Sequence, residues 1–125
     1  MHLQESGEMY LEAILVLSQR GKPVRSIDVS EYLGYTKPSV SRAMSLLRSS
    51  GYVEMDRNNY LTLTEEGSEV AERIYERHRV LAKLFMDLGV SSETAVEDAC
   101  RIEHVISDET FSAIKRHSEI YGTKE

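Results

Sequence analysis

The sequence predicts a mainly α-helical chain in which one short β-hairpin separates two helical blocks. Apolar residues recur with helical spacing before residue 50 and after residue 64, whereas they alternate with polar ones between residues 52 and 63. Serine, threonine and glycine residues mark where the helices begin and end. The 125 residues suffice for one moderate core or two small ones.

The first helical block is predicted to form three helices, over residues 6–19, 26–33 and 37–49. The run Gly-Lys-Pro ends the first helix, and Ser26 and Thr36 are the expected N-caps of the second and third. Only a few residues, including a glycine, join the second and third helices. That arrangement is typical of a helix-turn-helix.

Two alternating segments follow, residues 52–55 and 60–63, with the sequence Asp-Arg-Asn-Asn between them. Alternation predicts strands, and the four polar residues favour a tight turn. A helix-turn-helix followed directly by a hairpin is a winged helix-turn-helix, in which the hairpin is the two-stranded wing. Residues 1–64 are therefore predicted to be a DNA-binding domain.

The second helical block is predicted to form a long helix from residue 65 to about 88 and two shorter helices over residues 92–105 and 108–121. Ser92 and Ser107 are their expected N-caps, and the last four residues are expected to be frayed. These helices carry more apolar surface than a winged helix needs. This excess of apolar surface indicates an α-helical dimerisation domain, because proteins that bind double-stranded DNA through a helix-turn-helix commonly bind two half-sites as a homodimer.

Charge is distributed unevenly along the chain, although the formal net charge is -6. Residues 20–50 hold six basic and two acidic side chains, whereas residues 64–111 hold five basic and twelve acidic ones. The first block is therefore the expected face for double-stranded DNA. No stretch is apolar enough for a membrane span, and the N-terminus lacks the pattern of a signal peptide. A lone cysteine fits a reducing compartment. We therefore expect a cytoplasmic protein without a membrane partner.

Three residues near the C-terminal end, Cys100, Glu103 and His104, are spaced at i, i+3 and i+4 in a segment predicted to be helical. This spacing places a thiolate, a carboxylate and an imidazole on one helix face, which suits a divalent metal ion. The alternative is a small apolar cysteine in a helix core beside two solvated residues.

The whole chain resembles the diphtheria toxin repressor (DtxR/MntR) family of metal-dependent transcriptional regulators. The segments that carry the resemblance are EMYLEAI, KPSVSRAMSLL, LTEEG, ERHRVLAKLF and ACRIEHVISDE. The last segment is the most specific, because a helix-turn-helix alone is widespread. The chain resembles the short form of the family, which has no SH3-like third domain.

The resemblance implies a main metal site formed by Met9, Cys100, Glu103 and His104. Met9 and Cys100 match positions that are Met and Cys in the iron-sensing branch but Asp and Glu in the manganese-sensing branch. Glu103 and His104 match ligands that both branches share. Because sulfur donors are soft, the set favours Fe(II), with Co(II), Ni(II), Zn(II) or Mn(II) as other candidates.

A second site is implied around His78 and Glu12. His78 matches a ligand in both branches, and Glu12 matches a carboxylate ligand of the manganese branch. The accessory site of the iron branch is absent, because Ala82 and Val96 stand where its Glu and second His would be. Each of these residues also has an alternative interpretation when it is considered alone. Met9 could fill space in the hydrophobic core. His78 could pack on the apolar stripe of its helix, and Glu12 could be a solvated carboxylate.

The candidate DNA contacts lie on the third helix and in the hairpin turn. Arg42 can donate two hydrogen bonds to guanine, whereas Arg57 in the wing suits phosphate. Arg20, Lys22 and Arg25 also suit phosphates. Each could instead be a solvated surface cation, an alternative that fits Lys22 and Arg25 equally well. The full set of expected contact residues is Thr36, Lys37, Pro38, Ser39, Ser41, Arg42, Arg48 and Arg57.

The pattern and the resemblance together predict a repressor of metal-uptake genes that binds a palindromic operator when metal is bound, with residues 65–125 as the metal-binding and dimerisation domain. Three alternatives remain. The first is a Mn(II)-responsive repressor of the same family, and the second is a winged-helix regulator that senses a non-metal ligand or oxidation at Cys100. The third, a metalloenzyme, is disfavoured because the sequence has no HExxH motif and no glycine-rich phosphate loop.

Overall fold

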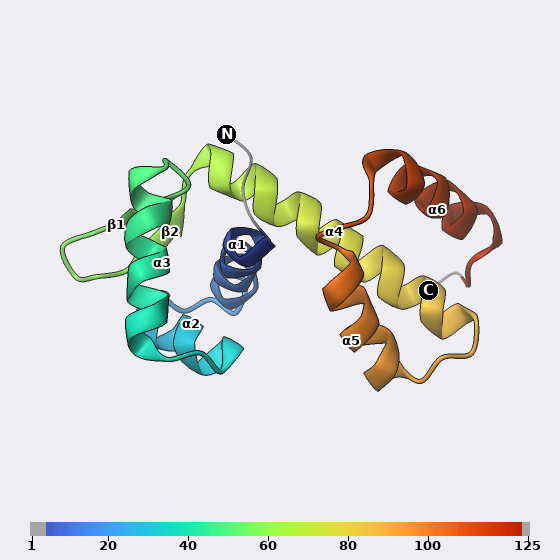
Figure 1. Ribbon diagram of the computed structural model, residues 1–125, viewed down its shortest axis with the longest axis horizontal. Helices are drawn as coiled ribbons and strands as arrows, with labels where there is room; N and C mark the ends of the chain where they lie inside the picture. Colours follow the sequence, from blue (N-terminus) through green and yellow to red (C-terminus); the bar gives the residue numbers. More distant parts are fainter. Residues whose placement is uncertain (1–4, 124–125) are drawn as a thin grey trace. The chain divides into compact units, whose positions relative to one another are not determined.

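Residues 5–123, the part of the chain that this computed structural model describes, form six helices and two strands (Figure 1). Contacts divide the chain into two compact units, of which unit 1 ends at Glu72 and unit 2 begins at Arg73. Helix α4 (Glu65–Asp87) contributes to both units. The prediction of a mainly α fold with one two-stranded sheet is confirmed.

Unit 1 contains three helices before the hairpin, α1 (Glu5–Ser18), α2 (Ser26–Leu33) and α3 (Lys37–Ser49). All three lie within a residue of the predicted bounds. The predicted cap of α2 is wrong, because Arg25 holds the N-cap position and Ser26 is already helical. The Asp28 carboxylate reaches back to accept the backbone N–H of Arg25 at 2.8 Å, so the cap comes from inside the first turn.

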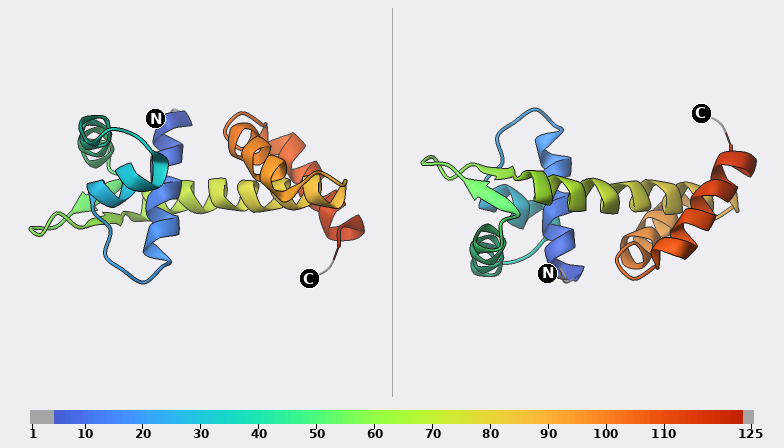
Figure 2. Two further views of the ribbon diagram at one scale, coloured as in Figure 1. Left: turned by 90° about the horizontal axis from the view of Figure 1, so that it is seen from below. Right: turned by 90° about the horizontal axis from the view of Figure 1, so that it is seen from above.

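The hairpin consists of strands β1 (Val53–Met55) and β2 (Leu61–Leu63), paired antiparallel with Met55 opposite Leu61. In its turn Asp56 Oδ1 accepts the N–H groups of Asn58 at 2.8 Å and Tyr60 at 3.0 Å, a pattern that fixes a tight reversal. Figure 2 shows the hairpin projecting beyond the helices of unit 1 in both views, as a wing does. The strands are shorter than predicted, because Tyr52 and Tyr60 lie outside the paired ladder.

The core of unit 1 joins the three helices to the hairpin and to the first turns of α4. Its fully buried side chains include Leu11 and Ile14 from α1, Val29 from α2, and Val40 and Met44 from α3. They recur at helical spacing, so that the opposite face of each helix is left to solvent. This packing holds α3 against the unit with its polar face exposed.

Unit 2 contains the rest of α4 together with α5 (Ser92–Ile102) and α6 (Asp108–Tyr121), which pack around Leu81, Ala82 and Ala99. The predicted N-cap and the predicted end of α5 are both wrong: Ser91, not Ser92, caps the helix by accepting the N–H of Thr94, and the helix ends at Ile102. The predicted cap of α6 is confirmed.

The C-terminal segment is held more firmly than the predicted frayed end. The Thr123 hydroxyl donates to Asp87 Oδ1 at 2.7 Å, and the N–H of Gly122 bonds the Ser118 carbonyl at 2.8 Å. Residues 124–125, which were also expected to be frayed, lie outside the described residues. Within residues 5–123, none of the helices has the length and apolar character that a bilayer crossing requires.

Candidate metal centre and nucleic-acid interface

Glu103 and His104 lie in the turn that connects α5 to α6. The N–H groups of Val105 and Ile106 both bond the Ile102 carbonyl at 3.0 Å, which closes the turn and ends the helix. The expectation that Cys100, Glu103 and His104 all lie within one helix is therefore wrong. Of the three, Cys100 alone is inside α5, where its side chain is exposed.

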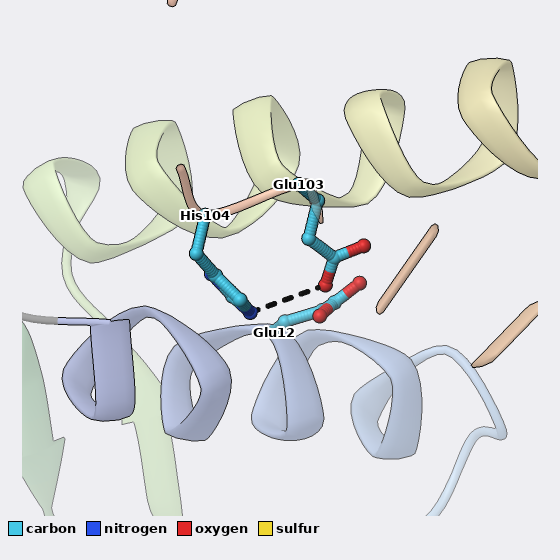
Figure 3. Close-up of side chains that lie close together, drawn as sticks. All are labelled: Glu12, Glu103 and His104. Carbon is cyan, nitrogen blue, oxygen red and sulfur yellow. Dashed lines mark ion pairs between the residues drawn. The ribbon is translucent and has the colours of Figure 1, made fainter. Parts of the chain in front are cut away.

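The Glu103 carboxylate is the centre of the candidate metal site in unit 2. Its side chain is 0% exposed, and its Oε2 lies 2.8 Å from Nδ1 of His78 on α4. Its Oε1 lies 3.3 Å from Nε2 of His104, whose side chain is also 0% exposed (Figure 3). Burying a carboxylate is costly unless its oxygens are satisfied, so this position needs a compensating charge or donor.

One oxygen of this carboxylate is not satisfied by hydrogen bonds. Among the described residues, Glu103 Oε1 has no hydrogen-bond partner, because its contact with His104 Nε2 lacks hydrogen-bond alignment. A buried carboxylate oxygen facing an imidazole nitrogen is a donor pair for a divalent cation. If His78 Nδ1 donates to the carboxylate, its Nε2 carries the lone pair that a metal needs. The residues therefore fit a divalent metal ion.

A residue that the sequence prediction missed, Arg77 on α4, holds this turn in place. Its guanidinium donates to the carbonyl of Glu103 at 3.3 Å and to the carbonyl of Ile106 at 2.6 Å, and it pairs with Asp108. The side chain is 7% exposed. Helical periodicity could have found it, because Arg77 lies three residues after the buried Ile74 and so falls on the apolar stripe of α4.

The other candidate ligands, Met9 and Glu12, lie one turn apart on α1 in unit 1 and share a face of that helix. Both side chains are half-buried. Met9 Sδ accepts a hydrogen bond from the hydroxyl of Tyr35 at 3.1 Å. Glu12, which Figure 3 also labels, is the carboxylate that α1 adds to the candidate ligands.

Helix α3 presents the candidate DNA-binding residues. Val40, Met44 and Leu47 are buried on one face of α3. Thr36 caps the helix, since its hydroxyl oxygen accepts the N–H of Ser39 at 3.3 Å. The remaining candidates on this helix are exposed: Lys37, Pro38, Ser41, Arg42 and Arg48.

Two of these residues contact each other near the start of the helix. Arg42 Nη2 reaches Ser39 Oγ at 3.5 Å, so the guanidinium lies over the first turn, where a recognition helix meets base edges. Contact with DNA stays a prediction.

The wing and the segment before α2 add further cations to unit 1. Arg57 is exposed in the hairpin turn. The Arg25 guanidinium lies 4.6 Å from the ring centroid of Tyr60, and that of Arg20 lies 5.4 Å from the ring of Tyr32. Such cation–π contacts keep the guanidinium groups at defined places on the surface.

Two family models match the chain and together span almost all of it. Residues 2–61 match the N-terminal DNA-binding domain of iron-dependent repressors. Residues 64–119 match the metal-binding and dimerisation domain of the same family.

Individual relatives include a transcriptional regulator called MntR and an iron-dependent repressor. The chain is 32% identical over 123 residues to the transcriptional regulator MntR of an Escherichia coli strain, covering 98% of this chain and 79% of that protein. It is 32% identical over 108 residues to the iron-dependent repressor IdeR of Mycobacterium tuberculosis, covering 86% of this chain and 47% of IdeR. It is also 31% identical to an HTH-type transcriptional regulator of Methanocaldococcus jannaschii, covering 98% of this chain and 99% of that one.

Solved structures agree with these matches. The manganese regulator SloR has a TM-score of 0.81 and 25% identity, over 95% of this chain and 55% of SloR. The crystal structure of T. acidophilum IdeR has a TM-score of 0.79 and 24% identity, over 98% of this chain and 57% of that one. The chain thus spans little more than half the length of these two proteins. Matches to both family models and to relatives above 30% identity place the chain in the iron-dependent repressor family, the DtxR/MntR family of metal-dependent transcriptional regulators.

Proposed function

We propose that this chain is an Fe(II)-activated repressor that binds a palindromic operator of metal-uptake genes as a homodimer. The observation that carries the metal-binding part is the buried Glu103 carboxylate, which lies between His78 and His104 and has an oxygen without a hydrogen-bond partner among residues 5–123. A buried carboxylate gains more from a nearby cation than a solvated carboxylate would, because burial has already removed its water.

In this proposal Met9, Cys100, Glu103 and His104 form the main site. Carboxylate and imidazole supply a hard and an intermediate donor, whereas thioether and thiolate are soft. His78 and Glu12 contribute to a second site, and the Glu103 carboxylate is the group that either site can use. Both imidazoles must be neutral and the thiol deprotonated for ligation, so metal affinity should fall as the pH is lowered.

The donor set is the reason to propose Fe(II) over Mn(II). Two sulfur donors disfavour Mn(II), which prefers oxygen and nitrogen, and Fe(II) is the intermediate metal that a reducing cell supplies in quantity. Mn(II) is the second candidate, because Glu12 adds a carboxylate and MntR and SloR are among the relatives. Co(II), Ni(II) and Zn(II) also suit the donors and serve as probes.

Metal gates DNA binding because the ligands come from two units of the chain. Met9 and Glu12 belong to unit 1, whereas Cys100, Glu103 and His104 belong to unit 2. An ion held by ligands from both units selects one arrangement of the winged helix relative to the dimerisation helices. Two recognition helices can then match half-sites roughly 34 Å apart, and the metal stabilises this state by binding it preferentially.

In this proposal the two functions belong to the two predicted domains. Residues 1–64 bind DNA, and residues 65–125 bind metal and form the dimer. On α3 Arg42 reads a base edge, and Arg57 in the wing contacts phosphate. Unit 2 offers exposed apolar side chains for dimerisation, since Leu88 is 72% and Val105 is 71% exposed. Such side chains are unfavourable in water and suit burial between two copies.

An anaerobic DNA-binding titration tests the proposed metal. Operator affinity is measured with chelator and with increasing Fe(II), Co(II) or Mn(II). We expect Fe(II) and Co(II) to activate binding at lower free concentrations than Mn(II). Activation by Mn(II) at lower concentrations than Fe(II) would replace the proposal by the manganese alternative. Equal affinity in chelator and in every metal, with a change on oxidation of Cys100, would favour the redox alternative.

A further inference from the structure

The hydroxyl of Tyr35 contacts a candidate metal ligand that is distant in sequence. Tyr35 Oη donates to Met9 Sδ at 3.1 Å, across 26 positions of the chain. Tyr35 lies in the turn between α2 and α3, and Met9 lies on α1, so both belong to unit 1. A thioether sulfur has two lone pairs, so a hydrogen bond to one leaves the other for a metal.

Tyr35 is held by Ser30 through its backbone and by Tyr10 through its ring. The Ser30 hydroxyl donates to the Tyr35 carbonyl at 2.5 Å, and the Tyr35 N–H bonds the Ser30 carbonyl at 3.2 Å. The Tyr35 ring lies edge-on to that of Tyr10, with centroids 5.9 Å apart and planes at 71°. Tyr10 is 8% exposed and Ser30 is 7% exposed, so the partners are parts of the packed unit. Tyr35 itself is 41% exposed, so its hydroxyl is positioned by the ring contact with Tyr10 and by its hydrogen bond to Met9.

A fixed hydroxyl matters for methionine more than for other ligands. Met has three rotatable bonds before its terminal methyl group, and ordering a long side chain costs on the order of 1 kcal/mol or more. A donor that already holds Sδ in one place lowers the cost of ordering Met9 when it ligates. Glu103, by contrast, is held by burial and by His78.

We infer that Tyr35 is the positioning residue for the Met9 thioether and joins this ligand to the start of the recognition helix. Tyr35 directly precedes Thr36, the N-cap of α3. The link Met9 to Tyr35 to Thr36 therefore connects a metal ligand on α1 with the first turn of α3 through one hydrogen bond and one peptide unit. The inference rests on the proposed function, because it gives Tyr35 its role through Met9 as a metal ligand.

The test is an anaerobic Co(II) titration of the full chain, followed by the absorption bands of the bound ion, on four variants and the wild type. Tyr35→Phe removes the hydroxyl and keeps the ring that contacts Tyr10. Met9→Leu removes the sulfur, and the double variant combines both changes. Tyr60→Phe is the matched control, because it removes a hydroxyl in the same unit while keeping the ring beside Arg25. Thermal unfolding without metal shows that each variant is folded.

We expect Tyr35→Phe to weaken Co(II) binding by about 2- to 10-fold, which is the effect of one neutral hydrogen bond. The loss should be smaller for Mn(II), which gains little from a thioether. In the Met9→Leu background Tyr35→Phe should have no further effect, because the two residues act as one unit. Tyr60→Phe should bind Co(II) like the wild type.

Two results overturn the inference and leave the proposed function standing. One is an unchanged Co(II) affinity in Tyr35→Phe when Met9→Leu binds more weakly. The other is an equal loss from Tyr35→Phe with and without Met9, which means that the hydroxyl acts by another route. If Met9→Leu itself leaves Co(II) affinity unchanged, both the inference and the proposed ligand role of Met9 are wrong.

Discussion

Arg77 should be one of the most important side chains for the stability of unit 2. Replacing it with Met keeps much of the apolar length and removes every donor. The carbonyl groups of Glu103 and Ile106 then lose a charged donor in a site where Arg77 is 7% exposed. Leaving a buried acceptor unsatisfied costs about 1–3 kcal/mol. The expected loss from both carbonyls is on the order of 2–6 kcal/mol.

The ion pair with Asp108 adds little to this loss. The Asp108 side chain is 84% exposed, and pairs with one exposed partner contribute roughly 0–1 kcal/mol. Asp108→Asn is therefore the matched control, with an expected loss below about 1 kcal/mol. The comparison separates the charge pair from the hydrogen bonds to the backbone.

Urea unfolding at one fixed chain concentration measures both variants, because dimerisation makes stability depend on concentration. With a slope of about 1–3 kcal/mol/M, a loss of this size moves the midpoint of Arg77→Met by about 1 M or more. The same variant should also bind metal more weakly, since the turn that carries Glu103 is no longer held. A midpoint within experimental error of the wild type, or an equal loss in Asp108→Asn, would refute the reasoning.

Three further predictions address DNA, metal choice and pH. Arg42→Ala should weaken binding to the specific operator by about 1–3 kcal/mol without changing metal affinity, and unchanged operator affinity would remove Arg42 from base readout. Replacing both sulfur ligands, Met9→Asp with Cys100→Glu, should move activation from Fe(II) toward Mn(II) in DNA-binding titrations, and a wild type that already prefers Mn(II) would contradict the soft-donor argument. The pKa of Asp87 is lowered by hydrogen bonds from Thr123 and then Lys83, so its contribution to stability is present above the unfolded pKa of about 4 and disappears as the pH falls through the folded pKa. Asp87→Asn should therefore lose less stability than the wild type between neutral pH and pH of about 3 in acid-unfolding curves, and parallel curves would show that the contact contributes nothing.

Helical periodicity and capping residues were enough to predict the helices of unit 1 and the position of the wing. The error at the start of α2 has a local cause. Both Ser26 and Asp28 are good capping residues, and the sequence does not show that Asp28 reaches back to the N–H of Arg25. The error at the end of α5 is of the same kind, because the segment from Cys100 onward keeps helical spacing through a turn that is not helical.

The sequence indicated which polar side chains are candidate ligands, but it did not show which of them are buried or what they contact. Their spacing indicated Glu103 and His104 as candidate ligands. It did not predict the 2.8 Å contact between Glu103 and His78, which are 25 positions apart. Periodicity could have placed Arg77 on the buried face of α4, but neither its carbonyl partners nor the contact of Tyr35 with Met9 could be predicted, because these contacts join distant segments. Those contacts depend on how helices pack, which sequence spacing along one helix does not report.

The central claim is that metal held by this site controls DNA binding, and His104 gives its most direct test. Affinity for the operator upstream of a metal-uptake gene is measured anaerobically with chelator, with Fe(II), and with Fe(II) on His104→Ala. Metal should tighten binding by about 5- to 150-fold in the wild type, a coupling of about 1–3 kcal/mol. His104→Ala should need much more Fe(II) for the same effect, because the site has lost a nitrogen donor. Equal affinity of the wild type in chelator and in Fe(II) would contradict the account.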